Sequence, residues 1–218
     1  MKNNDNKKPF FTVRRMAQLG ILTAIILVMG MTPIGYIHIP GLGLEITLIV
    51  IPVALGAILL GPLSGLFLGA VFGLTSFYQC FTPMSPFGAT LLSINPILTF
   101  LVCFPTRTLM GFLTGLAYHL VVKHAKSEGG KVGAHIMANV LGALMNTLFF
   151  MTALCLCFYN TEYIQSIKEG LNATNPLMFV IYFVGINGLV EAICAIVIGS
   201  AISYPLEKVL RRIGLLER

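Results

Sequence analysis

The chain has 218 residues, of which 56% are hydrophobic and only 10% are charged. Soluble domains usually carry about 25% charged residues, so this composition argues against a water-soluble fold and predicts a protein embedded in a lipid bilayer. The formal net charge of +6 arises mainly from residues at the ends of apolar segments, whereas a nucleic-acid interface needs a continuous basic patch. We therefore expect a membrane protein that binds no nucleic acid.

Residues 1–15 are polar and basic, and an apolar run follows at 16–36. A signal peptide has a similar order of segments. This run, however, reaches the roughly 20 residues that span a bilayer, and no small-residue cleavage site closes it. We interpret it as a retained first transmembrane helix.

Six segments have the apolar character expected of spanning helices. They lie at residues 16–36, 44–60, 63–78, from Ile97 or Pro105 to about Val122, 132–158 and 177–204. The second and third meet at Gly61-Pro62 and fit either a long hairpin or a re-entrant pair. The sequence thus predicts an all-α membrane protein, with a six-helix domain at 16–205 between basic tails at 1–15 and 206–218.

The basic residues orient this domain, because cytoplasmic segments of membrane proteins are enriched in Lys and Arg. With a cytoplasmic N-terminus, twelve basic residues fall on the inside and one, Lys168, falls on the outside. The inside residues are Lys2, Lys7, Lys8, Arg14, Arg15, Lys123, Lys126, Lys131, Lys208, Arg211, Arg212 and Arg218. Both termini are therefore expected in the cytoplasm, with outer connections at 37–43, 79–96 and 159–175, of which the second and third are long enough to form loops that cover the outer face.

The sequence contains no recognisable constellation for catalysis. An intramembrane aspartyl protease needs two aspartates within spans, and Asp5 is the only aspartate in the chain. No HExxH motif and no P-loop occurs, and the five cysteines include no CxxC pair. We expect no enzyme activity, no metal and no cofactor, so ATP-driven transport would need an ATPase on a partner subunit.

Ionisable residues inside spans are costly and are functional candidates by default. Arg107 lies in the outer half or near the centre of the fourth span, where its guanidinium could hold a carboxylate; the alternatives are snorkelling to the interface or pairing with Glu191. Glu191 lies roughly 21 Å below the outer end of the sixth span at 1.5 Å per residue, and we expect a structural role for it. The remaining members of the expected outer polar pocket are Asn146, Asn95, Gln79, Asn187 and Tyr36. The alternatives are hydrogen bonds between helices for the four amides and an ordinary interfacial position for the tyrosine.

The first span carries a small-xxx-small pair, Gly20 and Ala24, with Ala17 nearly in line. Such spacing lets another helix approach closely. The pair either packs within the bundle or forms a docking face for another subunit.

Several stretches together resemble a known family. They are TPIGYI at 32–37, IPVALGAILLGPLSG at 51–65, VFGLTSF at 71–77, Arg107 with Gly111 and Gly115, and Gly142 with Asn146-Thr147. Over nearly its whole length the chain resembles the substrate-binding S components of energy-coupling factor (ECF) transporters, most of all their pantothenate-type branch. One departure is that Thr106 separates Pro105 from Arg107, where the family often has Pro-Arg.

The resemblance implies a multi-pass protein of the bacterial plasma membrane, with six helices and a vitamin pocket near the outer face. It also implies a complex with a transmembrane T component and two cytosolic ATPases, in which Ala17, Gly20 and Ala24 contact the T component. The residues themselves leave open an S component for a different vitamin or precursor, a stand-alone small-solute permease, and a membrane enzyme or assembly factor.

Overall fold

The computed structural model of the chain describes residues 12–38, 45–125 and 127–216. In these residues the elements follow one another as α1 (Val13–Met31), the 3-10 turn η1 (Pro33–Gly35), β1 (Tyr36–His38), β2 (Glu45–Thr47), α2 (Val50–Leu60), α3 (Pro62–Gln79), α4 (Pro86–Ile94), α5 (Pro96–Val122), α6 (Glu128–Phe158), α7 (Glu162–Gly170), α8 (Pro176–Cys194), the π-helical turn η2 (Ala195–Gly199) and α9 (Ser200–Arg212). The two strands form an antiparallel ribbon.

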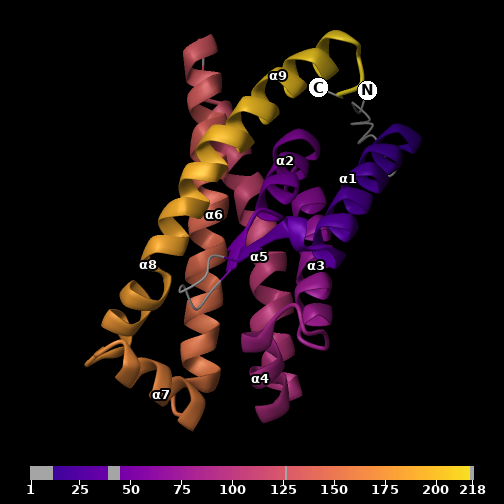
Figure 1. Cartoon of the computed structure of the whole chain (residues 1–218). Helices are drawn as coiled ribbons and strands as arrows, with labels where there is room; N and C mark the ends of the chain where they lie inside the picture. Colours follow the sequence, from indigo (N-terminus) through magenta and orange to yellow (C-terminus); the bar gives the residue numbers. More distant parts are fainter. Residues whose placement is uncertain (1–11, 39–44, 126, 217–218) are drawn as a thin grey trace, which may run out of the picture.

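The helices form a bundle with two distinct ends (Figure 1). The short helices α4 and α7 lie at one end, and the start of α1 and the segment after α9 lie close together at the other. The side chain of Gln18 on α1 donates a hydrogen bond to the carbonyl oxygen of Leu215 at 3.3 Å, which joins the two terminal segments.

Helices α3 and α5 cross in close contact because glycines meet at the crossing. A Cβ atom on Gly65 would lie 2.2 Å from the carbonyl oxygen of Gly111, and one on Gly111 would lie 2.1 Å from that of Gly65. Only the absence of side chains lets the two backbones approach so closely.

The surface of the bundle is strongly apolar. Leu156 is 82% exposed, and Leu148, Leu177 and Leu189 are also exposed. Extended exposed apolar surface marks contact with a membrane or a partner. Within the described residues, four helical stretches are long and apolar enough to cross a membrane, namely Val13–Met31, Pro96–Val122, Glu128–Phe158 and Gly188–Arg212.

Two predicted spans differ from the helices at their ends. The predicted second span at 44–60 is wrong in its first third, because residues 45–47 pair with 36–38 in the ribbon and α2 has only 11 residues. The predicted first span at 16–36 is too long at its end, because Pro33 opens the turn η1 and Tyr36 belongs to β1.

Helix α5 begins at Pro96, and Pro105 lies inside it, so the earlier of the two predicted starts of the fourth span is the right one. Two further helices stand where the sequence predicts outer loops. Helix α4 occupies part of 79–96, and α7 occupies part of 159–175. The fully buried Ile164 fastens α7 to the core beside Phe158 and Phe179.

The fifth and sixth predicted spans are longer in the structure. Helix α6 begins at Glu128, where the Ser127 hydroxyl accepts a hydrogen bond from the backbone N–H of Gly130 at 3.1 Å. The sixth predicted span continues past residue 204 to Arg212, through α8, η2 and α9. These extensions carry polar residues, which a hydropathy pattern does not include.

Candidate functional site

A cavity of about 330 Å³ lies among α3, α5, α6 and α8, next to the short helices α4 and α7. The ribbon contributes one residue from each strand, Tyr36 and Thr47. The volume falls at the lower end of the range of small-molecule sites, about 300–1,000 Å³. The cavity is therefore large enough for a small organic ligand.

Four of the six predicted binding residues line this cavity, and each comes from a different element. They are Tyr36 from β1, Gln79 from α3, Arg107 from α5 and Asn146 from α6. Residues that are up to 110 positions apart in the sequence thus share one site.

Arg107 is the cationic group of the cavity and is only 7% exposed. Its Nη1 donates to the carbonyl oxygen of Val102 at 2.8 Å and to the hydroxyl of Thr106 at 3.2 Å. The guanidinium carbon lies 4.6 Å from the ring centroid of Phe150 and 5.6 Å from that of Phe72, within cation–π range. Across the described residues its Nε has no hydrogen-bond partner and its charge forms no ion pair. A buried cation with a free donor is suited to bind an anion.

Asn146 and Gln79 add polar groups to the same cavity. Asn146 is 6% exposed, and its Oδ1 finds no hydrogen-bond partner in the described part of the chain. The Nε2 of Gln79 donates to the carbonyl oxygen of Gly30 at 2.8 Å and ties α3 to α1. The two amides therefore differ, since Gln79 is already engaged and the Asn146 oxygen is available to a ligand.

The other two predicted binding residues are placed differently. Asn95 does not line the cavity; its Oδ1 accepts hydrogen bonds from the backbone N–H groups of Ile97 and Leu98, each at 3.1 Å, and caps α5. The side chain of Asn187 lies outside the described residues, although Gly188 beside it lines the cavity.

Glu191 of α8, for which the sequence predicts a structural role, also lines the cavity. Its Oε1 accepts a hydrogen bond from the backbone N–H of Thr47 at 2.8 Å, and the Thr147 hydroxyl lies 3.4 Å from its Oε2. The expected structural hydrogen bonds are present. Glu191 also shares the cavity with Arg107, because the cavity is lined by residues of both α6 and α8.

No ion pair joins Arg107 to Glu191 in the described structure, so the predicted alternative of a direct pair is not the arrangement observed. Thr147 was missed by the sequence reasoning as well, although it directly follows Asn146. The sequence does indicate that Glu191 lies near the predicted pocket, because it follows Asn187 by four residues and therefore lies on the same helix face.

The cavity also contains cysteine side chains, which are potential metal ligands. Cys80 and Cys103 are buried, line the cavity and form no disulfide. Within 12–38, 45–125 and 127–216, no three His, Cys, Asp or Glu side chains gather as a metal site requires.

The small residues of α1 do not line this cavity and lie on the outside of the bundle. Ala17, Gly20 and Ala24 are all exposed, and a Cβ atom on Gly20 would meet nothing within 4 Å. The opposite face of α1 packs into the core through Leu22 and Ile26. Packing within the bundle, one of the two predicted roles for this strip, does not agree with its exposure, and docking of another subunit stays a prediction.

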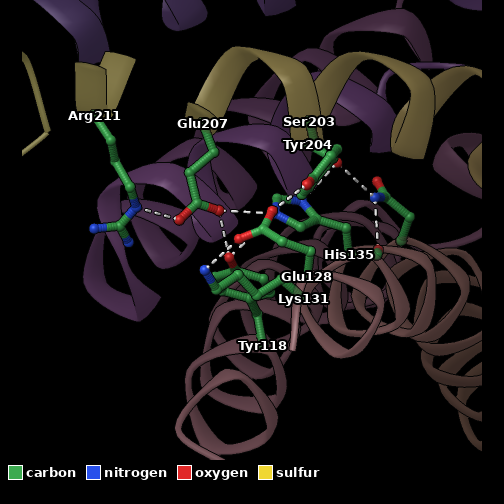
Figure 2. A network of polar contacts seen from close by, with 9 residues as sticks. Tyr118, Glu128, Lys131, His135, Ser203, Tyr204, Glu207 and Arg211 are labelled. Atoms are coloured by element: carbon green, nitrogen blue, oxygen red, sulfur yellow. Dashed lines mark hydrogen bonds and ion pairs between the residues drawn. The ribbon is translucent and has the colours of Figure 1, made fainter. Parts of the chain in front are cut away.

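A second buried polar cluster fastens α9 to the ends of α5 and α6 (Figure 2). The carboxylate of Glu207 accepts hydrogen bonds from Tyr118 and, at 2.6 Å, from the Nε of Arg211, and it lies 2.7 Å from the Nε2 of His135. The Nδ1 of His135 lies 2.9 Å from the Ser203 hydroxyl. None of these residues lines the cavity, so we assign this cluster a structural role at the end of the bundle where the termini lie.

Comparison with known proteins gives a consistent result. The sequence model of a family described as "ECF transporter, substrate-specific component" matches residues 14–203. The pantothenate transporter PanT of Leuconostoc mesenteroides subsp. mesenteroides is 27% identical over 217 residues, covering 99% of this chain and 99% of that protein. The pantothenic acid transporter PanT of Lactococcus lactis subsp. cremoris is 27% identical over 201 residues, covering 88% of this chain and 93% of that protein. The family match at 14–203 includes every element that lines the cavity.

Proposed function

Because the chain belongs to the family of substrate-specific components of ECF transporters, we propose that it is the specificity subunit of an ABC-type importer and captures pantothenate at the outer face of the membrane. The observation that carries the ligand assignment is the buried guanidinium of Arg107, which faces a cavity and has no carboxylate partner in the described structure. The carboxylate of a vitamin acid supplies that partner.

Pantothenate suits the chemistry of the cavity at more than one point. It carries one carboxylate, one amide and two hydroxyl groups on a short flexible chain. Arg107 offers donors to the carboxylate, and the oxygen of Asn146 offers an acceptor to an amide N–H or a hydroxyl. The names of the two relatives support the same vitamin.

We propose a six-span topology for this subunit, with α1, α2, α3, α5, α6 and the α8–α9 stretch as spans and both termini in the cytoplasm. The start of α1 and the segment after α9 lie side by side, and Arg14, Arg15, Arg211 and Arg212 belong to these two helices. Both observations support the proposal, because cytoplasmic segments are enriched in Lys and Arg. The cavity, which borders α4 and α7, then opens toward the outer face. The domain limits at 16–205, with a basic tail on either side, belong to the same proposal.

The energy for import comes, in this proposal, from a complex with a membrane T component and two cytosolic ATPases in the bacterial plasma membrane. The sequence contains no GxxxxGK[ST] motif with which to bind ATP itself. The exposed strip of Ala17, Gly20 and Ala24 provides a surface on which a helix of the T component can dock.

The ligand assignment is tested by purifying the chain in detergent and identifying by mass spectrometry the small molecule that it releases on denaturation. Calorimetric titration then compares pantothenate with its alcohol analogue, in which a hydroxymethyl group replaces the carboxylate. We expect pantothenate to be released and to bind about 10- to 150-fold more tightly than the alcohol, the range for a hydrogen bond to a charged group. Release of a different vitamin, with no saturable binding of pantothenate, would exclude this assignment.

A further inference from the structure

We propose that Glu191 forms the second pole of the ligand site, accepts hydrogen bonds from ligand hydroxyl groups and thereby selects a hydroxylated monocarboxylic acid. The inference rests on the proposed function, because it takes Arg107 as the anchor of the ligand carboxylate. It assigns the opposite end of the ligand to α8.

The first observation is that one cavity holds two buried opposite charges that do not pair. Arg107 is 7% exposed and Glu191 is 8% exposed, and both line the same space of about 330 Å³. The described residues place no ion pair between them. A buried charge is costly unless it is paired and hydrogen-bonded, so each of the two needs a partner that the ligand can supply.

The second observation is that the Glu191 end of the cavity offers mainly hydrogen-bond acceptors. An ionised carboxylate has about four acceptor positions. The Thr47 N–H occupies one on Oε1 at 2.8 Å, and the Thr147 hydroxyl makes only a long contact of 3.4 Å with Oε2. The side chains of Thr47 and Asn146 also lie beside this carboxylate, and the Oδ1 of Asn146 is without a hydrogen-bond partner in the described chain. Ligand hydroxyl groups can donate to this Oδ1 and to the Glu191 Oε2, which Thr147 contacts only at long range.

The polarity of the two ends orients the ligand. Arg107 presents N–H donors and attracts a carboxylate, whereas Glu191 repels a carboxylate and accepts from O–H groups. A molecule with a carboxylate at one end and hydroxyls at the other satisfies both ends at once. A dicarboxylate of similar length places like charges together in a desolvated site and is rejected.

The test is a binding cycle in which protein and ligand are changed separately. Wild type, Glu191→Gln and Glu191→Asp are titrated with pantothenate and with analogues that lack the terminal or the secondary hydroxyl. In wild type, removal of at least one hydroxyl should weaken binding about 10- to 150-fold, because a hydrogen bond to a charged group is lost. In Glu191→Gln the same removal should cost at most about 13-fold, and less than in wild type, because a bond between neutral groups contributes less. Glu191→Asp keeps the charge and should keep the preference for the hydroxyl.

A ligand with a second carboxylate tests directly whether the negative charge of Glu191 repels an anion. An analogue in which the terminal hydroxymethyl group is a carboxylate should bind Glu191→Gln at least about tenfold more tightly than it binds wild type. Glu162→Gln is the matched control, since it removes the same charge from an exposed position on α7 outside the cavity. This control should bind pantothenate, the two analogues that lack a hydroxyl and the dicarboxylate analogue with affinities within about twofold of wild type.

The outcomes separate this inference from the proposed function. If wild type prefers pantothenate to its alcohol analogue but Glu191→Gln keeps the full preference for the hydroxyl, the role of Glu191 is structural and only this inference fails. Equal weakening of every ligand by Glu191→Gln and Glu191→Asp leads to the same conclusion. If wild type does not bind pantothenate, the proposed function fails, and the inference fails with it.

Discussion

Gly69 on α3 lies directly against the backbone of Arg107 on α5, so that a Cβ atom on Gly69 would stand 2.3 Å from the Arg107 carbonyl oxygen. Backbone atoms cannot yield as the end of a flexible side chain can. The position of the cationic residue in the cavity therefore depends on the absence of a side chain on the neighbouring helix.

Gly69→Ala should separate α3 from α5 and displace the turn that carries Arg107. Overpacking of a close contact typically costs about 1–3 kcal/mol, so we expect a lower unfolding temperature in detergent together with weaker pantothenate binding. Gly133→Ala on α6 is the control, because a Cβ atom there would meet nothing within 4 Å. Equal unfolding temperatures and equal pantothenate affinities of the two variants would show that the α3–α5 contact can accommodate an added methyl group.

Arg107→Ala should weaken the binding of pantothenate about 10- to 150-fold while the protein still folds, since it removes the charge-assisted hydrogen bonds to the carboxylate. Arg107→Lys should recover only part of the affinity, because Lys lacks the planar fork of donors. Calorimetric titration measures both. The alcohol analogue should lose little on either substitution, and binding of pantothenate by Arg107→Ala within about twofold of wild type would make Arg107 a structural residue.

The proposed topology places Ser166 of α7 outside and Ser127, the cap of α6, inside. We expect a single cysteine at Ser166, in a cysteine-free background, to react with a membrane-impermeant maleimide in intact cells. A cysteine at Ser127 should react only after lysis. This substitution removes the N-cap of α6, which should lower the free energy of unfolding by about 1 kcal/mol. Labelling of both positions from outside would contradict the six-span arrangement.

Gly20→Leu combined with Ala24→Leu should abolish pantothenate uptake by the assembled transporter, because two large side chains prevent close approach of a helix to the exposed strip on α1. Ligand binding by the purified subunit should remain unchanged, since the strip lies outside the cavity. Gly185→Leu is the control for added bulk on another exposed helix position, where a Cβ atom also meets nothing within 4 Å. Uptake that survives the double substitution would place the docking surface elsewhere.

Tyr118→Phe should destabilise the fold by about 1.5–3 kcal/mol, because it removes a buried hydrogen bond to the charged carboxylate of Glu207. Pantothenate affinity should stay within about twofold, since neither residue lines the cavity. Tyr204→Phe provides the comparison: its hydroxyl donates to Glu128 at 2.6 Å in an exposed position, where solvent screening should make the loss of stability much smaller than in Tyr118→Phe. Thermal unfolding in detergent, followed by titration, measures both effects, and equal stabilities of the two variants would refute the role of the cluster.

The fold class and some residues of the candidate site can be predicted from local features of the sequence. Hydropathy and the placement of Lys and Arg indicate a membrane bundle, since apolar runs and basic ends act within one segment at a time. Arg107 was predictable as a site residue because a charge inside an apolar run is costly wherever it occurs. The small strip of Gly20 and Ala24 was equally visible, although its spacing alone did not distinguish internal packing from docking.

Which side chains meet was decided only by the tertiary structure. Asn95 has a polar side chain that could bind a ligand, but this side chain caps α5. Glu191 lies near the far end of α8 and still lines the cavity. The short helices α4 and α7 border the cavity, although neither is long enough to leave a clear hydropathy pattern. These results depend on contacts between distant segments, such as the glycine crossing of α3 and α5 and the pairing of β1 with β2. Periodicity along one helix specifies the face on which a residue lies, but the crossing of helices determines what that face meets.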